Sequence, residues 1–275
     1  MTDTRTRIGF IGGGNMARAM VGGLLKAGHR ADRLLVSDPS AAQLDRIRAL
    51  HSDIVAGADN LATLAGADVL VLAVKPQLIE EILTPLADAA RPDGQLVISI
   101  AAGITLDTLG KLVAPTRAIV RVMPNQPALV GAGMAVLTAT PETSAAQRDD
   151  AQYVAGTTGR AEWVEDENLM NAVTAVSGSG PAYFYLLMEL MEEAARNMGI
   201  PADLARTLAR QTAFGAGRVA AESDLELRAL RESVTSKGGT TAAALASFEA
   251  SDIRAIVERA MRAARDRSVE LGTRD

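Results

Sequence analysis

Residues 8–17 read Ile8-Gly9-Phe10-Ile11-Gly12-Gly13-Gly14-Asn15-Met16-Ala17, an apolar run followed by three glycines and the start of a helical pattern. The spacing fits G-x-G-x-x-A at a tight turn between a strand and a helix. In such a turn Gly12 permits the bend, Gly14 lets the backbone approach a pyrophosphate, and Ala17 takes the third small position. The same pattern also occurs as an ordinary strand-to-helix turn, so its surroundings decide between the two interpretations.

The first half of the chain alternates apolar runs with helical segments, which predicts a Rossmann-type doubly wound parallel sheet in an α/β fold. Residues 69–74 are continuously apolar, as expected for a central strand covered on both faces. A further strand pair brackets a helical stretch and extends the sheet. The expected strands are 7–12, 33–37, 69–73, 96–100, 118–122, 134–138 and 161–164, and the expected helices are 16–27, 41–50, 78–89 and 143–157.

From about residue 166 onward the strand signals stop, and helices are expected near 181–198, 241–249 and 251–271. We therefore predict a dinucleotide-binding Rossmann domain at 1–164 and an all-helical dimerisation domain at 165–275. The helical part has too little chain to bury all of its apolar side chains, so we expect a homodimer. The side chains that need cover are those of Tyr183, Phe184, Leu186, Leu187 and Phe214.

Asp38 ends the second expected strand, about 20 residues beyond the glycine loop, where a carboxylate can accept from a ribose hydroxyl. Its charge would repel the 2'-phosphate of NADPH, while the neighbouring Ser37 and Ser40 could donate hydrogen bonds to that phosphate. These residues favour NADH by a small margin. NADPH stays open, because Arg18 or Arg46 could be recruited by the fold.

Composition excludes several classes of function. The 275 residues carry a net charge of −5, 3% aromatic side chains and no cysteine. Neither the basic surface nor the stacking side chains of a nucleic-acid-binding protein are present, and disulfides, thiolate nucleophiles and cysteine-ligated zinc are excluded. Residues 1–7 lack a secretory signal pattern, and no apolar run approaches the roughly 20 residues of a membrane span. We expect a cytoplasmic protein with no metal, nucleic-acid or membrane partner.

Five further segments accompany the glycine loop: 73–76 (AVKP), 99–103 (SIAAG), 121–125 (RVMPN), 177–183 (SGSGPAY) and 236–241 (SKGGTT). Taken together and in this order, they make the chain resemble the pyrroline-5-carboxylate reductase family over essentially its whole length. The resemblance implies reduction of the cyclic imine 1-pyrroline-5-carboxylate to L-proline, the last step of proline biosynthesis, with NADPH or NADH as hydride donor. It also implies a homodimer or a larger ring of dimers. One position departs from the family, which usually has proline where this chain has Lys237; the loop could be less rigid, or the lysine could add positive charge near a carboxylate.

The segment Gly238-Gly239-Thr240-Thr241 precedes an expected helix, whose free backbone N–H groups suit a carboxylate. The resemblance assigns Gly238, Gly239 and Thr240 to the substrate, together with Ser177, and assigns the hydroxyl of Thr241 to the imine nitrogen as the catalytic contact. The alternative is an ordinary loop between helices in which a threonine is the N-cap.

The resemblance also assigns a cofactor site along the Rossmann half. Lys75 would face the cofactor, or would be a solvated lysine before a helix; Asn60 would contact the ribose-phosphate part, or would cap the helix near Leu61. Small residues would line the nicotinamide side, and their alternative is core packing. The complete predicted set is Gly12, Gly14, Asn15, Met16, Ser37, Asp38, Asn60, Ala73, Val74, Lys75, Pro76 and Ala101.

Competing functions are less well supported. A nucleophilic serine within 177–181 would need glycine at 177 and a histidine later in the chain, whereas His29 and His51 both precede it and are expected at the surface. β-Hydroxyacid dehydrogenases share the layout but use a lysine in the first long helix of the second domain, and 181–198 contains none. A nucleotide-sensing protein would need only the Rossmann half, so the loop at 238–241 favours an enzyme.

Overall fold

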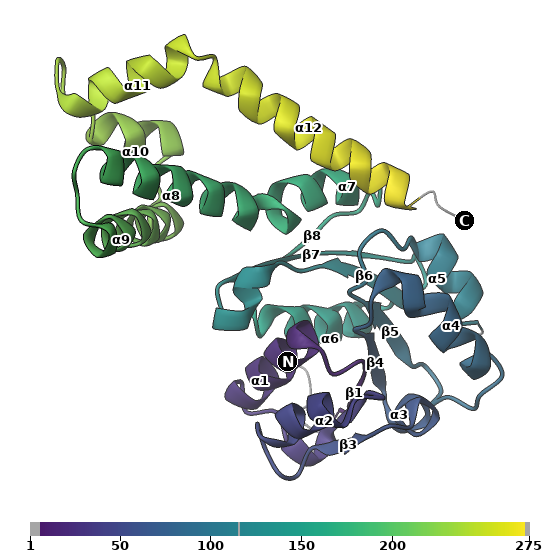
Figure 1. Ribbon diagram of the computed structural model, residues 1–275. Coiled ribbons are helices and arrows are strands. Elements are labelled where there is room, and N and C mark those ends of the chain that lie inside the picture. The colour runs from purple at the N-terminus through teal and green to yellow at the C-terminus, as the bar shows by residue number, and fades with distance from the viewer. Residues whose placement is uncertain (1–5, 115, 273–275) are drawn as a thin grey trace. The chain divides into compact units, whose positions relative to one another are not determined.

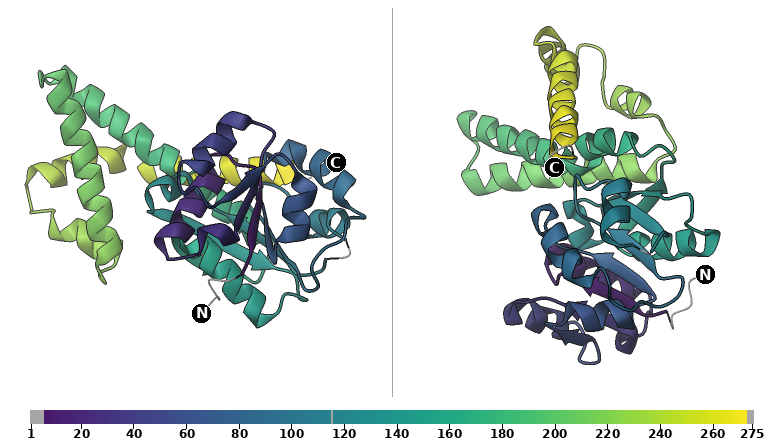
Figure 2. Two further views of the ribbon diagram at one scale, coloured as in Figure 1. Left: turned by 90° about the horizontal axis from the view of Figure 1, so that it is seen from below. Right: turned by 90° about the vertical axis from the view of Figure 1, so that its right-hand side faces the viewer.

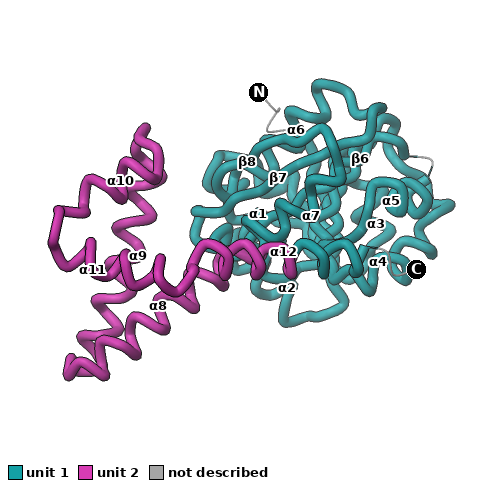
Figure 3. The backbone as a smooth tube through the Cα atoms, turned by 90° about the horizontal axis from the view of Figure 1, so that it is seen from above, with its two compact units in different colours: residues 1–178, 265–275 teal, residues 179–264 magenta. Residues whose placement is uncertain are grey.

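A computed structural model describes residues 6–114 and 116–272 of the chain (Figure 1). These fall into two compact units, residues 1–178 with 265–275, and residues 179–264 (Figure 3). The predicted domain limits, 1–164 and 165–275, stay a prediction, because compact units need not coincide with domains.

The first unit is built on one eight-stranded sheet with the order β3-β2-β1-β4-β5-β6-β7-β8. Neighbouring strands are parallel except for β6 and β7, which are antiparallel. The doubly wound α/β class is thus confirmed, and the added pair β7 and β8 extends the sheet beyond β6. The strands are β1 (Ile8–Ile11), β2 (Leu34–Ser37), β3 (Val55–Gly57), β4 (Val69–Leu72), β5 (Leu96–Ser99), β6 (Ile119–Met123), β7 (Gly133–Ala139) and β8 (Gly159–Trp163).

Helices cover both faces of this sheet, as Figures 1 and 2 show. On one face pack α1 (Asn15–Lys26), α2 (Ala41–Arg48) and α6 (Ala145–Gly156); on the other pack α3 (Asn60–Gly66), α4 (Ile79–Leu83) and α5 (Leu106–Leu112). Alternate residues of the central strands supply the two cores, because side chains of a strand point to opposite faces in turn. In β4, Val69 and Val71 join one core, and Leu70 and Leu72 join the other.

Shorter elements complete the first unit. The expected helix at 78–89 is wrong as one element: the chain forms a 3-10 turn, α4 and a second 3-10 turn that contains Pro85. Proline lacks the N–H that would continue the helix. The remaining elements are η1 (Ala31–Arg33), η2 (Pro76–Leu78), η3 (Thr84–Leu86), η4 (Gln126–Val130), α7 (Leu169–Val173) and the π-helical turn η5 (Thr174–Gly178).

The prediction that both histidines lie at the surface is confirmed for His51 and wrong for His29. His29 is only 3% exposed and lies against the ring of Tyr153. Gly28, with a φ of 86°, reverses the chain at the end of α1 and directs His29 into the core. The buried imidazole has Nε2 at 3.1 Å from the carbonyl oxygen of Thr6.

The second unit is entirely helical, as predicted. It contains α8 (Gly180–Asn197), α9 (Ala202–Glu222), α10 (Leu227–Ser233), α11 (Thr240–Ala250) and the first part of α12 (Ile253–Gly272). Many of its large apolar side chains are exposed in the single chain, among them Phe184 at 66% and Phe214 at 62%. No helix within 6–114 and 116–272 is both long enough and apolar enough to cross a bilayer.

Candidate active site

The glycine loop connects β1 to α1, and its first glycine is required by the fold. Gly12 has a φ of 100°, and a Cβ placed on it would lie 2.5 Å from the carbonyl oxygen of Ala73. Its N–H donates to the carbonyl oxygen of Ser37 at 2.7 Å. Gly14 differs, because a Cβ there would meet nothing within 4 Å. The space beside Gly14, at the first turn of α1 with its free N–H groups, fits a pyrophosphate.

Asp38 fixes this loop to the end of β2. Its Oδ2 accepts from the N–H of Gly13 at 2.8 Å, and its Oδ1 accepts from the N–H of Ser40 at 2.8 Å. The carboxylate therefore shapes the loop in addition to any ribose contact. The Ser37 hydroxyl is buried and donates to the carbonyl oxygen of Phe10. A cofactor contact of Ser37 stays a prediction, and its buried hydroxyl does not support one.

The segment Ala73-Val74-Lys75-Pro76 lies at the carboxyl edge of the sheet, next to the glycine loop. Ala73 N donates to the carbonyl oxygen of Ile11 at 2.8 Å, which joins the ends of β4 and β1. Lys75 is exposed, and its ammonium has no ion-pair partner within the described ranges. Ala101, after β5, is 3% exposed, so its small side chain is part of the core while its backbone lines this edge.

Asn60 is the first residue of α3 but is not its cap. Asp59 is the N-cap, with Oδ1 accepting from the N–H groups of Leu61 at 2.9 Å and Ala62 at 3.2 Å. The alternative that Asn60 caps this helix is therefore wrong. Sequence analysis missed Asp59, although aspartate before an apolar helix is a usual cap signal. The half-buried Asn60 amide makes no hydrogen bond to any described residue.

Ser177 lies in the π-helical turn η5. Its hydroxyl donates to the carbonyl oxygen of Val173 at 3.1 Å, and its own carbonyl oxygen accepts from Asn125 Nδ2 at 3.0 Å. Asn125 also accepts from Met134 N at 2.9 Å, so one amide connects β7 to this turn. Sequence analysis gave Asn125 no role beyond the motif that contains it. The assignment of Ser177 to the substrate stays a prediction.

The predicted substrate loop lies in the second unit, at the start of α11. Gly239 N donates to the carbonyl oxygen of Ser236 at 3.1 Å, and Gly238 has a φ of 75°. Gly239 is the N-cap, so the alternative in which a threonine caps α11 is wrong. Thr241 is the second helical residue and is half-buried, and its hydroxyl makes no hydrogen bond within the described part of the chain. The structure keeps Gly238, Gly239, Thr240 and Thr241 together beside free N–H groups.

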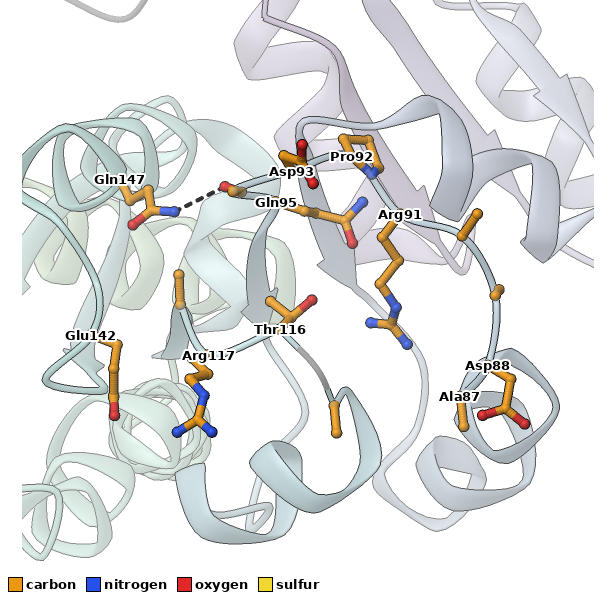
Figure 4. Close-up of a pocket in the computed structure, with 15 residues that line it drawn as sticks. Ala87, Asp88, Arg91, Pro92, Asp93, Gln95, Thr116, Arg117, Glu142 and Gln147 are labelled. Atoms are coloured by element: carbon orange, nitrogen blue, oxygen red, sulfur yellow. Dashed lines mark hydrogen bonds between the residues drawn. The ribbon is translucent and has the colours of Figure 1, made fainter.

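A hollow of about 860 Å³ lies at the opposite, amino edge of the sheet, before β5 and β6 (Figure 4). Arg91 on its wall donates to the carbonyl oxygens of Val113 and Leu86, so its guanidinium holds backbone segments together. Nearby acidic side chains, including Asp93 and Glu142, make the lining mixed in charge. No predicted site residue lines this hollow. Within the described residues, no group of three or more histidine, cysteine or acidic side chains is placed to hold a metal.

Comparison with known proteins places the chain in a family. Residues 167–271 match the family model for pyrroline-5-carboxylate reductase dimerisation, and residues 7–103 match the model described as NADP oxidoreductase, coenzyme F420-dependent. The pyrroline-5-carboxylate reductase of Haemophilus influenzae is 47% identical over 267 residues, 97% of each chain. The chain belongs to the pyrroline-5-carboxylate reductase family.

Solved structures agree with this membership. The pyrroline-5-carboxylate reductase of Coxiella burnetii matches with a TM-score of 0.92 at 37% identity, covering 98% of this chain and all of that one. The Plasmodium falciparum pyrroline carboxylate reductase, crystallised with NADP bound, matches with a TM-score of 0.82 at 28% identity over 98% of each chain. The family resemblance that the motifs indicate is therefore confirmed over nearly the whole chain.

Proposed function

We propose that the chain reduces 1-pyrroline-5-carboxylate to L-proline, the last step of proline biosynthesis, with NADPH or NADH. The observation that carries this proposal is the 47% identity to a reductase of that name along nearly the full length of both chains. The open space at Gly14 supports it, because that space would admit the pyrophosphate of a dinucleotide. When bound, the reduced nicotinamide supplies the hydride.

The first unit holds the cofactor along the carboxyl edge of its sheet. Backbone groups of Gly14, Asn15 and Met16 would hold the pyrophosphate above the turn that Gly12 forms, and Asp38 would accept from the adenosine ribose. Lys75 and Asn60 extend toward the phosphates and ribose, and their free polar groups support this use. The nicotinamide side is lined by Ala73, Val74, Pro76 and Ala101.

The second unit supplies the substrate contacts. Backbone N–H groups at Gly238 and Thr240 bind the carboxylate, helped by the positive end of α11. Gly239 shapes this anion site as the N-cap, since its own N–H donates to Ser236. The Thr241 hydroxyl donates to the imine nitrogen, and Ser177 is the further residue that we assign to the substrate. A neutral hydroxyl is a weak acid, so these residues act by positioning the imine and excluding water.

The direct test measures NADPH and NADH consumption by the purified chain with 1-pyrroline-5-carboxylate and identifies the product. Formation of L-proline in step with cofactor consumption is expected. A chain that binds NADPH but forms no proline would contradict the proposed reaction. Oxidation of a 3-hydroxy acid serves as the control, and no activity is expected there.

Cofactor preference depends on Asp38. We expect Asp38→Asn to raise the ratio of kcat/KM for NADPH to that for NADH, because the change removes the charge that opposes a 2'-phosphate. Asparagine keeps one oxygen for the Gly13 or Ser40 N–H, so it disturbs the glycine loop less than serine would. An unchanged ratio in a folded variant would show that Asp38 serves the loop alone.

Assembly and location complete the proposal. The exposed apolar side chains of the second unit, including Leu187 and Leu190, support pairing of two chains through their helical units. Larger rings of such dimers, and a place in the cytoplasm, are consistent with this function. Light scattering of the purified chain measures the number of copies.

A further inference from the structure

One strand of the sheet carries a charged side chain that is buried. Arg121 lies in β6 between two buried valines, and only 7% of its side chain is exposed. Its Nη1 donates to Glu167 Oε1 at 2.7 Å. Because removal of Glu167 would leave the buried Arg121 charge uncompensated, this pair differs from the exposed ion pairs elsewhere on the chain.

The same carboxylate oxygen has a second donor. The backbone N–H of Leu106, the first residue of α5, donates to Glu167 Oε1 at 2.9 Å. Glu167 therefore joins β6 to the end of the segment 100–105, which runs from β5 into α5.

Segment 100–105 packs Ile100, Ala101 and Ile104 against the two cores but makes few other hydrogen bonds. At its start, the N–H of Ile100 donates to the carbonyl oxygen of Leu72, and that of Ala101 donates to the Ser99 hydroxyl. The N–H groups of residues 102–105 have no hydrogen-bond partner within the described residues. Gly103, with a φ of 80°, contacts the end of α12, where a Cβ on Gly272 would lie 3.1 Å from the Gly103 oxygen. The Leu106 end of the segment is thus held by Glu167.

The segment occupies the part of the carboxyl edge where the reacting half of a dinucleotide belongs. The sheet order puts β5 beside β4, and β4 beside β1 with its glycine loop. Ligands of doubly wound sheets bind outside the carboxyl ends of the strands. Since Asp38 marks the adenosine side at β2, the opposite end of the dinucleotide extends over β4 and β5.

We propose that Glu167 and Arg121 are positioning residues for the reduction. They hold segment 100–105 in the place that keeps the nicotinamide at the distance and angle needed for hydride transfer. Neither residue touches the reacting atoms, and the inference rests on the proposed function. Its consequence is that loss of the pair slows the chemical step more than it weakens cofactor binding, because the adenosine half is held separately at Gly14 and Asp38.

The test compares Glu167→Ala with the unsubstituted chain, using NADPH and 1-pyrroline-5-carboxylate. We expect kcat to fall about 10-fold to 100-fold, the loss that follows from slight misplacement of reacting groups, while the Kd of NADPH in a fluorescence titration changes little. The primary isotope effect on kcat, measured with NADPH deuterated at the transferred position, should rise as hydride transfer becomes slower relative to other steps. Glu167→Gln keeps an acceptor oxygen without the charge, so its kcat should lie between that of Glu167→Ala and that of the unsubstituted chain.

Asp68→Asn, at a more exposed ion pair, is the control for Glu167→Gln. Asp68 accepts from Arg7 Nη2 and from the backbone N–H of Arg7, each at 2.9 Å, so it makes the same two kinds of contact at the amino edge of the sheet. We expect this change to lower the Tm and to leave kcat and the isotope effect unaltered.

Three results would overturn the inference. The first is a Glu167→Ala variant with unaltered kcat and isotope effect and only a lowered Tm, and the second is an equal kinetic change in Asp68→Asn. If Glu167→Ala does not fold, the kinetics of Glu167→Gln test the inference instead. An unaltered kcat in Glu167→Gln is the third overturning result. Absence of proline formation by the unsubstituted chain would instead contradict the proposed function, and the inference with it.

Discussion

Gly12 and Gly14 stand two residues apart in one loop, and the structure separates their tasks. Gly12 has backbone geometry and surroundings that admit no side chain, whereas Gly14 borders open space. One glycine thus serves the fold and the other is free to serve a ligand. The sequence pattern names both positions and does not distinguish them in this way.

We expect Gly14→Val to weaken NADPH binding severely in a chain that still folds, because its side chain would fill the space proposed for the pyrophosphate and its Cβ would meet no other atom within 4 Å. Gly12→Ala is the comparison, and it should cost more than about 1 kcal/mol of stability because its φ is positive and Ala73 blocks the Cβ. Titration with NADPH beside a melting curve measures both. Unaltered affinity in a folded Gly14→Val chain would exclude this loop from the cofactor site.

At Thr241, too, an effect on the reaction can be distinguished from an effect on stability. We expect Thr241→Ala to lower kcat/KM about 10-fold to 100-fold, which corresponds to the loss of one positioned hydrogen bond of about 1 to 3 kcal/mol. Because Gly239 and not Thr241 is the N-cap, alanine should leave the Tm unchanged. Thr241→Ser should restore most of the rate. A normal kcat/KM for Thr241→Ala would show that the hydroxyl has no part in the reaction.

The turn before α11 explains how the chain accepts Lys237 at a position where the family resemblance leads us to expect proline. The hydrogen bond from Gly239 to Ser236 closes a four-residue turn with Lys237 second and Gly238 third. A positive φ at the third position only is typical of a type II turn, in which the second position favours proline. The Lys237 N–H makes no hydrogen bond to any described residue.

We therefore expect Lys237→Pro to fit this turn without strain and to raise stability by about 0.4 to 1 kcal/mol, because it restricts the unfolded chain. The same substitution removes a positive charge close to the proposed carboxylate contacts. Lys237→Gln, which removes the charge alone, is the control for an effect on KM. Chemical denaturation measures the stability, and a destabilised Lys237→Pro chain would contradict the turn assignment.

Elements were predictable from the sequence where the apolar period was long and clear. The five central strands and the helices α1, α8 and α12 follow from that period, and α6 was expected as a helical stretch between two strands. The strand β3 was not predicted, because three residues ending in glycine carry no measurable alternation. The helices α5 and α10 were missed as well, since each has only seven residues and its burial depends on tertiary contacts.

The candidate site was predictable from the sequence where its residues lie in recognisable motifs. The motifs located the glycine loop, Asp38 and the loop at 238–241. Contacts between distant segments, such as Asp38 with Gly13 or Arg121 with Glu167, have no signal in local spacing. The sequence hints at the second of these contacts only by placing the charged Arg121 within the apolar strand β6. A buried charge of this kind needs a partner.

The first unit contains a buried group that couples the stability of the protein to pH. Burial lowers the pKa of His29, since the charged imidazolium is disfavoured in the core. The unfolded chain then takes up a proton at a higher pH than the folded chain does. The free energy of unfolding should therefore decrease as the pH falls below about 6.5 toward the lowered pKa.

We expect His29→Gln to show a weaker loss of Tm than the unsubstituted chain over this acidic range, because glutamine does not titrate. His51→Gln is the matched control, since His51 is exposed, and its profile should follow that of the unsubstituted chain. Melting curves between about pH 5 and pH 8 make the comparison. Identical slopes for all three chains would contradict the coupling.

The return of α12 to the first unit has a consequence for biosynthesis. Residues 265–272 belong to the unit that begins with β1, although the whole second unit is translated between them. At about 5 to 20 residues per second, the ribosome needs on the order of ten seconds for that interval. During this time Gly103 and Asn171 lack their contacts with α12, so the Rossmann unit emerges incomplete and closes only when its final helical turns leave the exit tunnel.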